Sequence, residues 1–138
     1  MPTAPAGPTP PAGYAQSCAA AAPWGVQVSA PFVCIDAPAA GTTVPPGSDL
    51  VVSGYAGGSF ESHVLVEVGG VLAQTASDMV ATVPLTYVAP DVGMPGFWST
   101  TIRLPADGLP STLRVTASFS SPRDGSVVAS ASVDFTTR

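Results

Sequence analysis

Apolar and polar residues alternate along several stretches of the chain, with the period of two that marks a β-strand with one buried face. The clearest stretch is 127–136, where every second residue is apolar and the others are mostly Ser, Asp and Thr. Residues 63–68 likewise place three valines opposite His63, Leu65 and Glu67. The pattern predicts strands near residues 33–36, 49–56, 63–68, 71–76, 81–87, 97–104, 112–119 and 127–136.

Clusters of turn-forming residues separate these stretches, among them "GTTVPPGSD", "PADGLPS" and "SPRDGS". Pro23 and Pro31 end any helix that the alanines at 19–22 begin. Short strands at this spacing, without helices between them, predict an all-β protein. We expect an immunoglobulin-like antiparallel β-sandwich of about seven or eight strands.

The first residues have a different composition from the rest of the chain. Residues 1–13 alternate Pro with Thr, Ala and Gly, a composition that favours extended polyproline II and buries little apolar surface. We therefore divide the chain into a Pro- and Ala-rich N-terminal arm or linker, residues 1–33, and one β-sandwich, residues 34–138. The whole chain of 138 residues has the size of a single domain.

The charge balance excludes one class of partner. Only 9% of the residues are charged, no lysine is present, and the formal net charge is −5. Nucleic-acid binding depends on clustered positive charge, so we expect no nucleic-acid partner. The start of the sequence has neither a basic nor an apolar segment of the kind found in secretory signals, and we expect no membrane insertion of this chain.

Cys18 and Cys34 are the two cysteines, with 15 residues between them. We expect a disulfide, which for a loop of about that length would contribute about 3 kcal/mol on the chain-entropy model. Such a bond indicates a compartment outside the reducing cytosol. The alternative is two unpaired buried cysteines, and pairing within or between chains is open. Two Cys and one His are too few for a structural zinc site, and no metal or cofactor is expected.

An ordered set of short motifs spans residues 34–138. It comprises a strand that ends in Pro at "IDAP", the strand "LVVSGYA", the turn "FE" at Phe60-Glu61, and the turn "SPRDGS". In this order they resemble the immunoglobulin-like domain associated with bacterial spore-germination proteins. The resemblance implies a β-sandwich in exported or lipid-anchored envelope proteins, with an accessory or interaction role and no catalytic residue to transfer.

His63, two positions after Glu61, is the candidate for catalysis that the sequence offers. Alternation places it opposite the valines, so we expect a surface histidine. A catalytic group needs a partner within hydrogen-bond reach, and the chain has no second histidine. Aspartates stand singly, mostly at turns, and suggest no paired-carboxylate site. We expect no enzyme activity, while a calcium site built from distant loops is left open.

Two function hypotheses remain. The first is a non-catalytic structural and protein-interaction module of the extracellular space or cell envelope, self-assembling when Val26–Ile35 adds a strand to a neighbour's sheet. The alternative is a carbohydrate- or peptide-binding module that uses the 88–98 loop and Trp98. Alternation with Ile102 and Leu104 favours a buried Trp98. Trp24 and Phe97 are further candidates for ligand or interface contacts.

Overall fold

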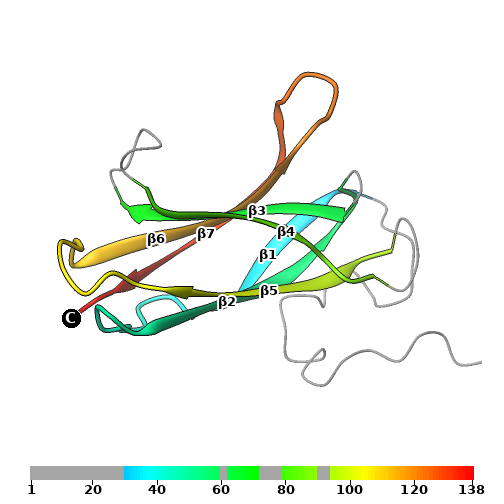
Figure 1. Cartoon of the computed structure of the whole chain (residues 1–138). Helices are drawn as coiled ribbons and strands as arrows, with labels where there is room; N and C mark the ends of the chain where they lie inside the picture. The colour runs from blue at the N-terminus through cyan, green and yellow to red at the C-terminus, as the bar shows by residue number, and fades with distance from the viewer. Residues whose placement is uncertain (1–29, 60–61, 72–78, 90–93) are drawn as a thin grey trace, which may run out of the picture.

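The computed structural model describes residues 30–59, 62–71, 79–89 and 94–138. Within these ranges the chain forms seven strands in two antiparallel sheets (Figure 1). One sheet has the order β1-β2-β5 and the other the order β4-β3-β6-β7. The strands are β1 (Phe32–Ala37), β2 (Asp49–Gly57), β3 (His63–Gly70), β4 (Met79–Thr86), β5 (Gly96–Arg103), β6 (Thr112–Ser120) and β7 (Val127–Thr136).

This architecture confirms the predicted all-β sandwich. Strand β7 has the bounds that its alternation predicts, and the other six begin and end within two residues of the predicted positions. The additional strand expected at 71–76 is not among the seven, because Val71 is a turn residue and 72–78 lie outside the described residues. Residues 1–29 of the predicted arm also lie outside them. Strand β1 starts at Phe32, so the sandwich takes in the last two residues that we assigned to the arm.

The core lies between the sheets and is built from the inward side of each strand. The three valines of β3 are at most 1% exposed, as the alternation predicts. Trp98 of β5, 3% exposed, joins the same cluster from the opposite sheet. Burial of these aliphatic and aromatic side chains supplies most of the stabilisation, at about 25 cal/mol per Å² of apolar surface removed from water. Other members of this cluster are Val33, Leu50, Val52, Ile102, Leu113, Val115 and Phe135.

After β1 the chain crosses from one sheet to the other. Val44 donates its backbone N–H to the carbonyl of Thr136 at 2.8 Å, and Thr136 donates to the carbonyl of Thr42 at 2.8 Å. Thr43 and Thr136 form a parallel bridge. The crossing ties the end of β7 to the segment that follows β1. It therefore closes the sandwich at this edge near the C-terminal end of β7.

The β6–β7 hairpin extends beyond the rest of its sheet (Figure 1). Its turn is fixed locally, because the Asp124 carboxylate accepts hydrogen bonds from the Ser126 N–H at 2.9 Å and from the Ser126 hydroxyl at 2.7 Å. The backbone bond from the Ser126 N–H is the main cause that holds the pKa of Asp124 below its ordinary value, followed by the hydroxyl bond. Gly125 has a φ of 74°, which glycine adopts without a steric penalty.

Candidate interaction surfaces

His63 lies at the start of β3 and is exposed, which confirms the prediction of a surface histidine. It lines a groove of about 360 Å³ together with Pro84 and Phe119. Ser59 also lines the groove, but its hydroxyl donates to the backbone carbonyl of His63 at 2.7 Å. This hydrogen bond thus stabilises the turn before β3. Glu61 lies outside the described residues.

Across the described ranges, no group of three or more His, Cys, Asp and Glu side chains lies close enough to hold a metal ion. The same part of the chain contains no helix that is both long and apolar enough to cross a membrane.

Trp98 is buried against the middle strand of its sheet. The indole lies over Gly54, where a Cβ atom would come within 2.5 Å of the Trp98 ring. A ring enclosed in this way has no open face on which a sugar could stack. Phe97 points to the other side of β5 and contacts the ring of Tyr55. Trp24 and residues 90–93 of the 88–98 loop lie outside the described residues.

An aromatic face covers the outer side of the three-stranded sheet, away from the core. We define it as Phe32, Cys34, Tyr55 and Phe97. Cys34 and Phe97 lie opposite Tyr55 on the neighbouring strands, so the three side chains point to the same side. The Tyr55 ring centroid lies 5.6 Å from that of Phe32 and 4.7 Å from that of Phe97. Cys34 is not a free thiol, and its predicted partner Cys18 lies outside the described residues.

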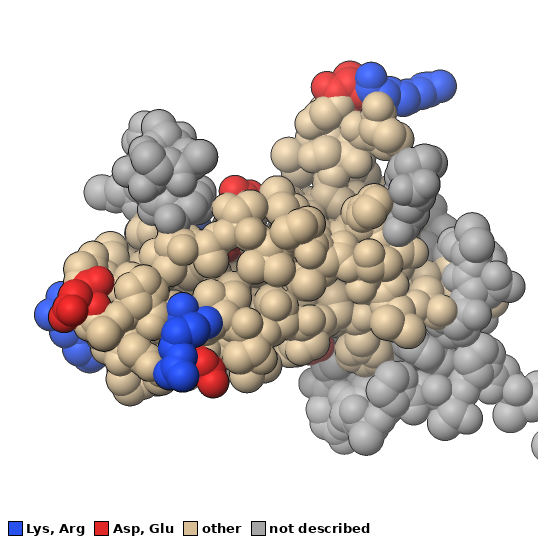
Figure 2. All heavy atoms as spheres, in the orientation of Figure 1, with Lys and Arg blue, Asp and Glu red and all other residues tan. Residues whose placement is uncertain are grey.

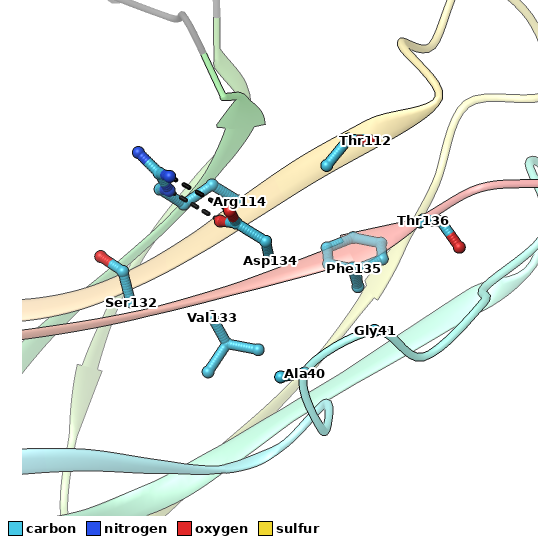
Figure 3. Close-up of a pocket in the computed structure, with 9 residues that line it drawn as sticks. All are labelled: Ala40, Gly41, Thr112, Arg114, Ser132, Val133, Asp134, Phe135 and Thr136. Atoms are coloured by element: carbon cyan, nitrogen blue, oxygen red, sulfur yellow. Dashed lines mark hydrogen bonds and ion pairs between the residues drawn. The ribbon is translucent and has the colours of Figure 1, made fainter.

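A second groove, of about 520 Å³, follows β7 near the crossing from β1 (Figure 3). Arg114 and Asp134 lie beside it as a two-pronged ion pair, with Nε donating to Oδ1 at 2.7 Å and a terminal guanidinium nitrogen to Oδ2 at 3.1 Å. The Arg114 hydrogen bond is the main cause that lowers the pKa of Asp134. The bond to Asp134 likewise raises the pKa of Arg114. Both of these guanidinium donors of Arg114 are already bonded to Asp134. The ion pair therefore holds β6 and β7 together and is poorly suited to bind an anion.

A further surface is the outer edge of the first half of β7, which we call the hairpin edge, Val127–Ala131. Residues 127–129 of this edge lie beyond the end of the β3–β6 pairing. Its residues pair with β6 on one side. On the other side, the strand's hydrogen bonds among described residues involve Asp134 and Thr136 only. Val127 and Val128 are 64% and 43% exposed. Figure 2 shows charged side chains at the hairpin tip and at the end of the molecule that carries the C-terminus, with mostly uncharged surface between them.

The sequence alone did not predict the aromatic face, the ion pair or the hairpin edge. The sequence did contain one signal for the aromatic face. In "LVVSGYA", Tyr55 falls on the side of the strand opposite to the core residues Leu50 and Val52. Val51 and Ser53 lie on the same side as Tyr55. An aromatic on the outer side of a strand marks a covered face or a contact surface. The other two depend on which strands become neighbours, and local alternation carries no such information.

The described residues form a protein of the immunoglobulin-like β-sandwich class. No protein-family model matches the chain, and no curated protein matches its sequence. Among solved structures, WR4, a C. elegans MSP family member, is similar with 12% identity and a TM-score of 0.35, over 77% of this chain and 97% of that chain. The predicted resemblance to the spore-germination-associated domain stays a prediction.

Proposed function

We propose that this protein is a non-catalytic structural and protein-interaction module of the extracellular space or cell envelope, and that it associates with a second copy through the hairpin edge. The observation that carries the proposal is the projecting, uncharged strand segment with two exposed valines. Edge strands in soluble proteins are usually protected by charges, proline or bulges. Strand β4, at the opposite edge of the same sheet, has Pro84 in its middle.

The hairpin edge suits pairing with an identical copy. Two such edges can align antiparallel about a two-fold axis, which is the commonest symmetry of homodimers. Residues 127–131 are Val, Val, Ala, Ser and Ala, so no like charges meet when the same segment pairs with itself. Small side chains also allow close approach of the two sheets. Main-chain hydrogen bonds then supply affinity, as in other strand-addition complexes.

The sequence-based candidate for strand addition, Val26–Ile35, is partly occupied. Phe32 to Ile35 pair with Gly57 to Gly54 of β2 in the same chain. Donating these residues to a neighbour would remove a strand from the donor's own sheet. We therefore place the intermolecular contact at β7.

The predicted disulfide at Cys34 supports the proposed location. A cysteine that is not a free thiol fits an oxidising compartment, where disulfides form and persist. The proposed partner in this bond is Cys18. Reduction and alkylation followed by mass measurement would count the thiols released, and no mass change on reduction would contradict the location argument.

Light scattering over a wide range of concentrations tests the association. The full chain is expected to approach twice its monomer mass as concentration rises. Replacing both exposed valines by lysine, Val127→Lys and Val128→Lys, places charges on the edge and should leave a monomer. The matched control is Val51→Lys, since Val51 is 52% exposed but lies on β2, between two strands. A monomeric wild type, or equal effects of the edge and control variants, would overturn the proposal.

A further inference from the structure

The outer face of the four-stranded sheet carries a row of polar side chains near the middle of β3. Glu67 of β3 lies opposite Thr116 of β6, and Thr116 lies opposite Ser132 of β7. The three side chains therefore point to the same side of the sheet. Figure 3 shows Ser132 on the same side of β7 as Arg114, with Val133 on the other side. The Thr116 and Ser132 hydroxyl oxygens are 3.1 Å apart and share a hydrogen bond.

The next row along the strands contains a gap. Gly69 of β3 lies opposite Arg114 of β6, so the β3 end of this row has no side chain. Glycine inside a strand often marks a place where a ligand approaches the backbone closely. A groove of about 250 Å³ occupies this position. Among the residues that line it are Glu67, Gly69, Arg114, Thr116 and Ser132.

The charges around the groove restrict the kind of ligand. Arg114 directs its Nε and one terminal nitrogen to Asp134, which balances its charge. The Glu67 carboxylate forms no hydrogen bond or ion pair with any residue that the structure describes. The groove therefore carries a negative charge without a described counter-charge, which disfavours an anionic ligand. Its polar lining also disfavours an apolar one, because the lining groups would lose their hydration without gaining hydrogen bonds.

We propose that this groove is the binding site for one neutral sugar unit, a free hexose or a hexosyl residue of a polysaccharide. Adjacent hydroxyls of a sugar ring donate to the two carboxylate oxygens of Glu67, while the hydroxyls of Thr116 and Ser132 donate or accept as the sugar requires. Arg114 keeps further N–H groups, beyond the two bonded to Asp134, that donate to sugar oxygens. The groove therefore offers both the acceptors and the donors that a hydroxyl-rich ring needs.

The size of the groove sets the size of the ligand. Its volume of about 250 Å³ lies below the range of about 300–1,000 Å³ that is typical for drug-sized ligands, so it fits a single ring. A hexose has about twelve non-hydrogen atoms, and at ordinary ligand efficiency it binds with a dissociation constant of about a millimolar. The groove lies on the face of the sheet and not at the hairpin edge, so sugar binding does not depend on self-association.

An NMR titration of the isotope-labelled full chain tests the site. Glucose, mannose and galactose are each added to about 100 mM, well above the expected dissociation constant. At least one of them should give saturable shifts of the backbone amides of Gly69, Thr116 and Ser132. Sodium sulfate should leave these amides unchanged. No saturable shift with any of the three sugars, or the same shifts with sulfate, would overturn the proposal.

Methyl glycosides of the bound hexose separate the two sources of the sugar. A residue of a polysaccharide has its anomeric oxygen linked to the next unit, so a site for such a residue should bind the methyl glycoside as well as the free sugar. Loss of binding on methylation would identify the free sugar as the ligand.

Variants of the lining residues test the proposed contacts. Glu67→Ala should weaken binding at least about tenfold, and Glu67→Gln, which keeps one acceptor oxygen, should weaken it less. Thr116→Val keeps the shape of the side chain, removes the hydroxyl and should weaken binding about threefold. The matched controls are Asp107→Ala and Thr101→Val, which remove the same kinds of group from exposed positions outside the groove. Equal losses in the control variants would overturn the proposal.

Discussion

Gly54 of β2 and Trp98 of β5 are register partners, and the indole occupies the space where a side chain at position 54 would lie. A Cβ atom there would come within 2.5 Å of the Trp98 ring and would also overlap the carbonyl oxygen of Cys34 on β1. Because position 54 carries no side chain, the Trp98 ring can lie over β2 and fill the core. Both neighbours are rigid, because one is a packed aromatic ring and the other is backbone.

Gly54→Ala should therefore lower the free energy of unfolding by about 2 to 3 kcal/mol, the upper range for overpacking a well-packed core. Urea denaturation followed by tryptophan fluorescence measures the change. Gly70→Ala is the matched control, since Gly70 also lies in a strand and its added Cβ would meet only Pro110 at an ordinary 3.5 Å. The control is expected to change stability by no more than about 0.5 kcal/mol. A similar loss in both variants would contradict the steric argument.

The core itself is readable from the sequence because burial follows local alternation. Val66, Trp98 and Phe135 are all buried, as the period of two predicts. This information is contained within each strand and needs no knowledge of its neighbours. The surfaces are different, because a contact such as that between Arg114 and Asp134 depends on the register of β6 against β7. The sequence of either strand alone does not determine that register.

The order of the strands in a sheet likewise cannot be predicted from the pattern within one strand. The hairpin edge exists because β7 is the last strand in the order β4-β3-β6-β7, which long-range pairing determines. The alternation of residues 127–136 would look the same in a central strand. Tyr55 is the intermediate case, since its place on the outer side of β2 was visible in the sequence. Its burial on that side was not, because burial there depends on which parts of the chain become neighbours.

Phe135 makes the largest single contribution that β7 offers to the core, being 0% exposed within the buried cluster. Phe135→Ala should destabilise the protein by about 3 to 5 kcal/mol through lost burial and the cavity left behind. Val127→Ala on the same strand should change stability by less than about 0.5 kcal/mol, because Val127 is exposed. Thermal unfolding of both variants gives the comparison, and a loss for Phe135→Ala as small as that for Val127→Ala would be inconsistent with this core.

Gly125 in the hairpin turn is required for its backbone angle and not for space. Its φ is 74°, and an added Cβ atom would meet nothing within 4 Å. Gly125→Ala should cost about 1 to 2 kcal/mol, the penalty for an L-residue in the left-handed region. Gly125→Asn should lose less, because asparagine tolerates that region. Chemical denaturation of the two variants ranks them, and an alanine variant as stable as the wild type would show that the turn adopts another geometry.

The ion pair between Arg114 and Asp134 should give the protein's stability a defined dependence on pH. The hydrogen bond from Arg114 holds the pKa of Asp134 below its ordinary value of about 3.9. A folded-state pKa lower than the unfolded one means that the stabilisation is complete above the unfolded value and is lost as pH falls through the folded one. Asp134→Asn should therefore be less stable than the wild type at neutral pH, and the difference should shrink progressively below about pH 4.

The ion pair between Arg103 and Asp49 provides the matched comparison for this pH effect. It has a closest contact of 3.3 Å and side chains that are 72% and 57% exposed, against 2.7 Å, 41% and 45% for Arg114 and Asp134. Solvent screens the more exposed pair more strongly, so Asp49→Asn should show a smaller difference at neutral pH and a weaker dependence on pH. Urea titrations at a series of pH values measure both. A difference for Asp134→Asn that stays constant from neutral pH into acid would mean that the carboxylate's charge does not stabilise the fold.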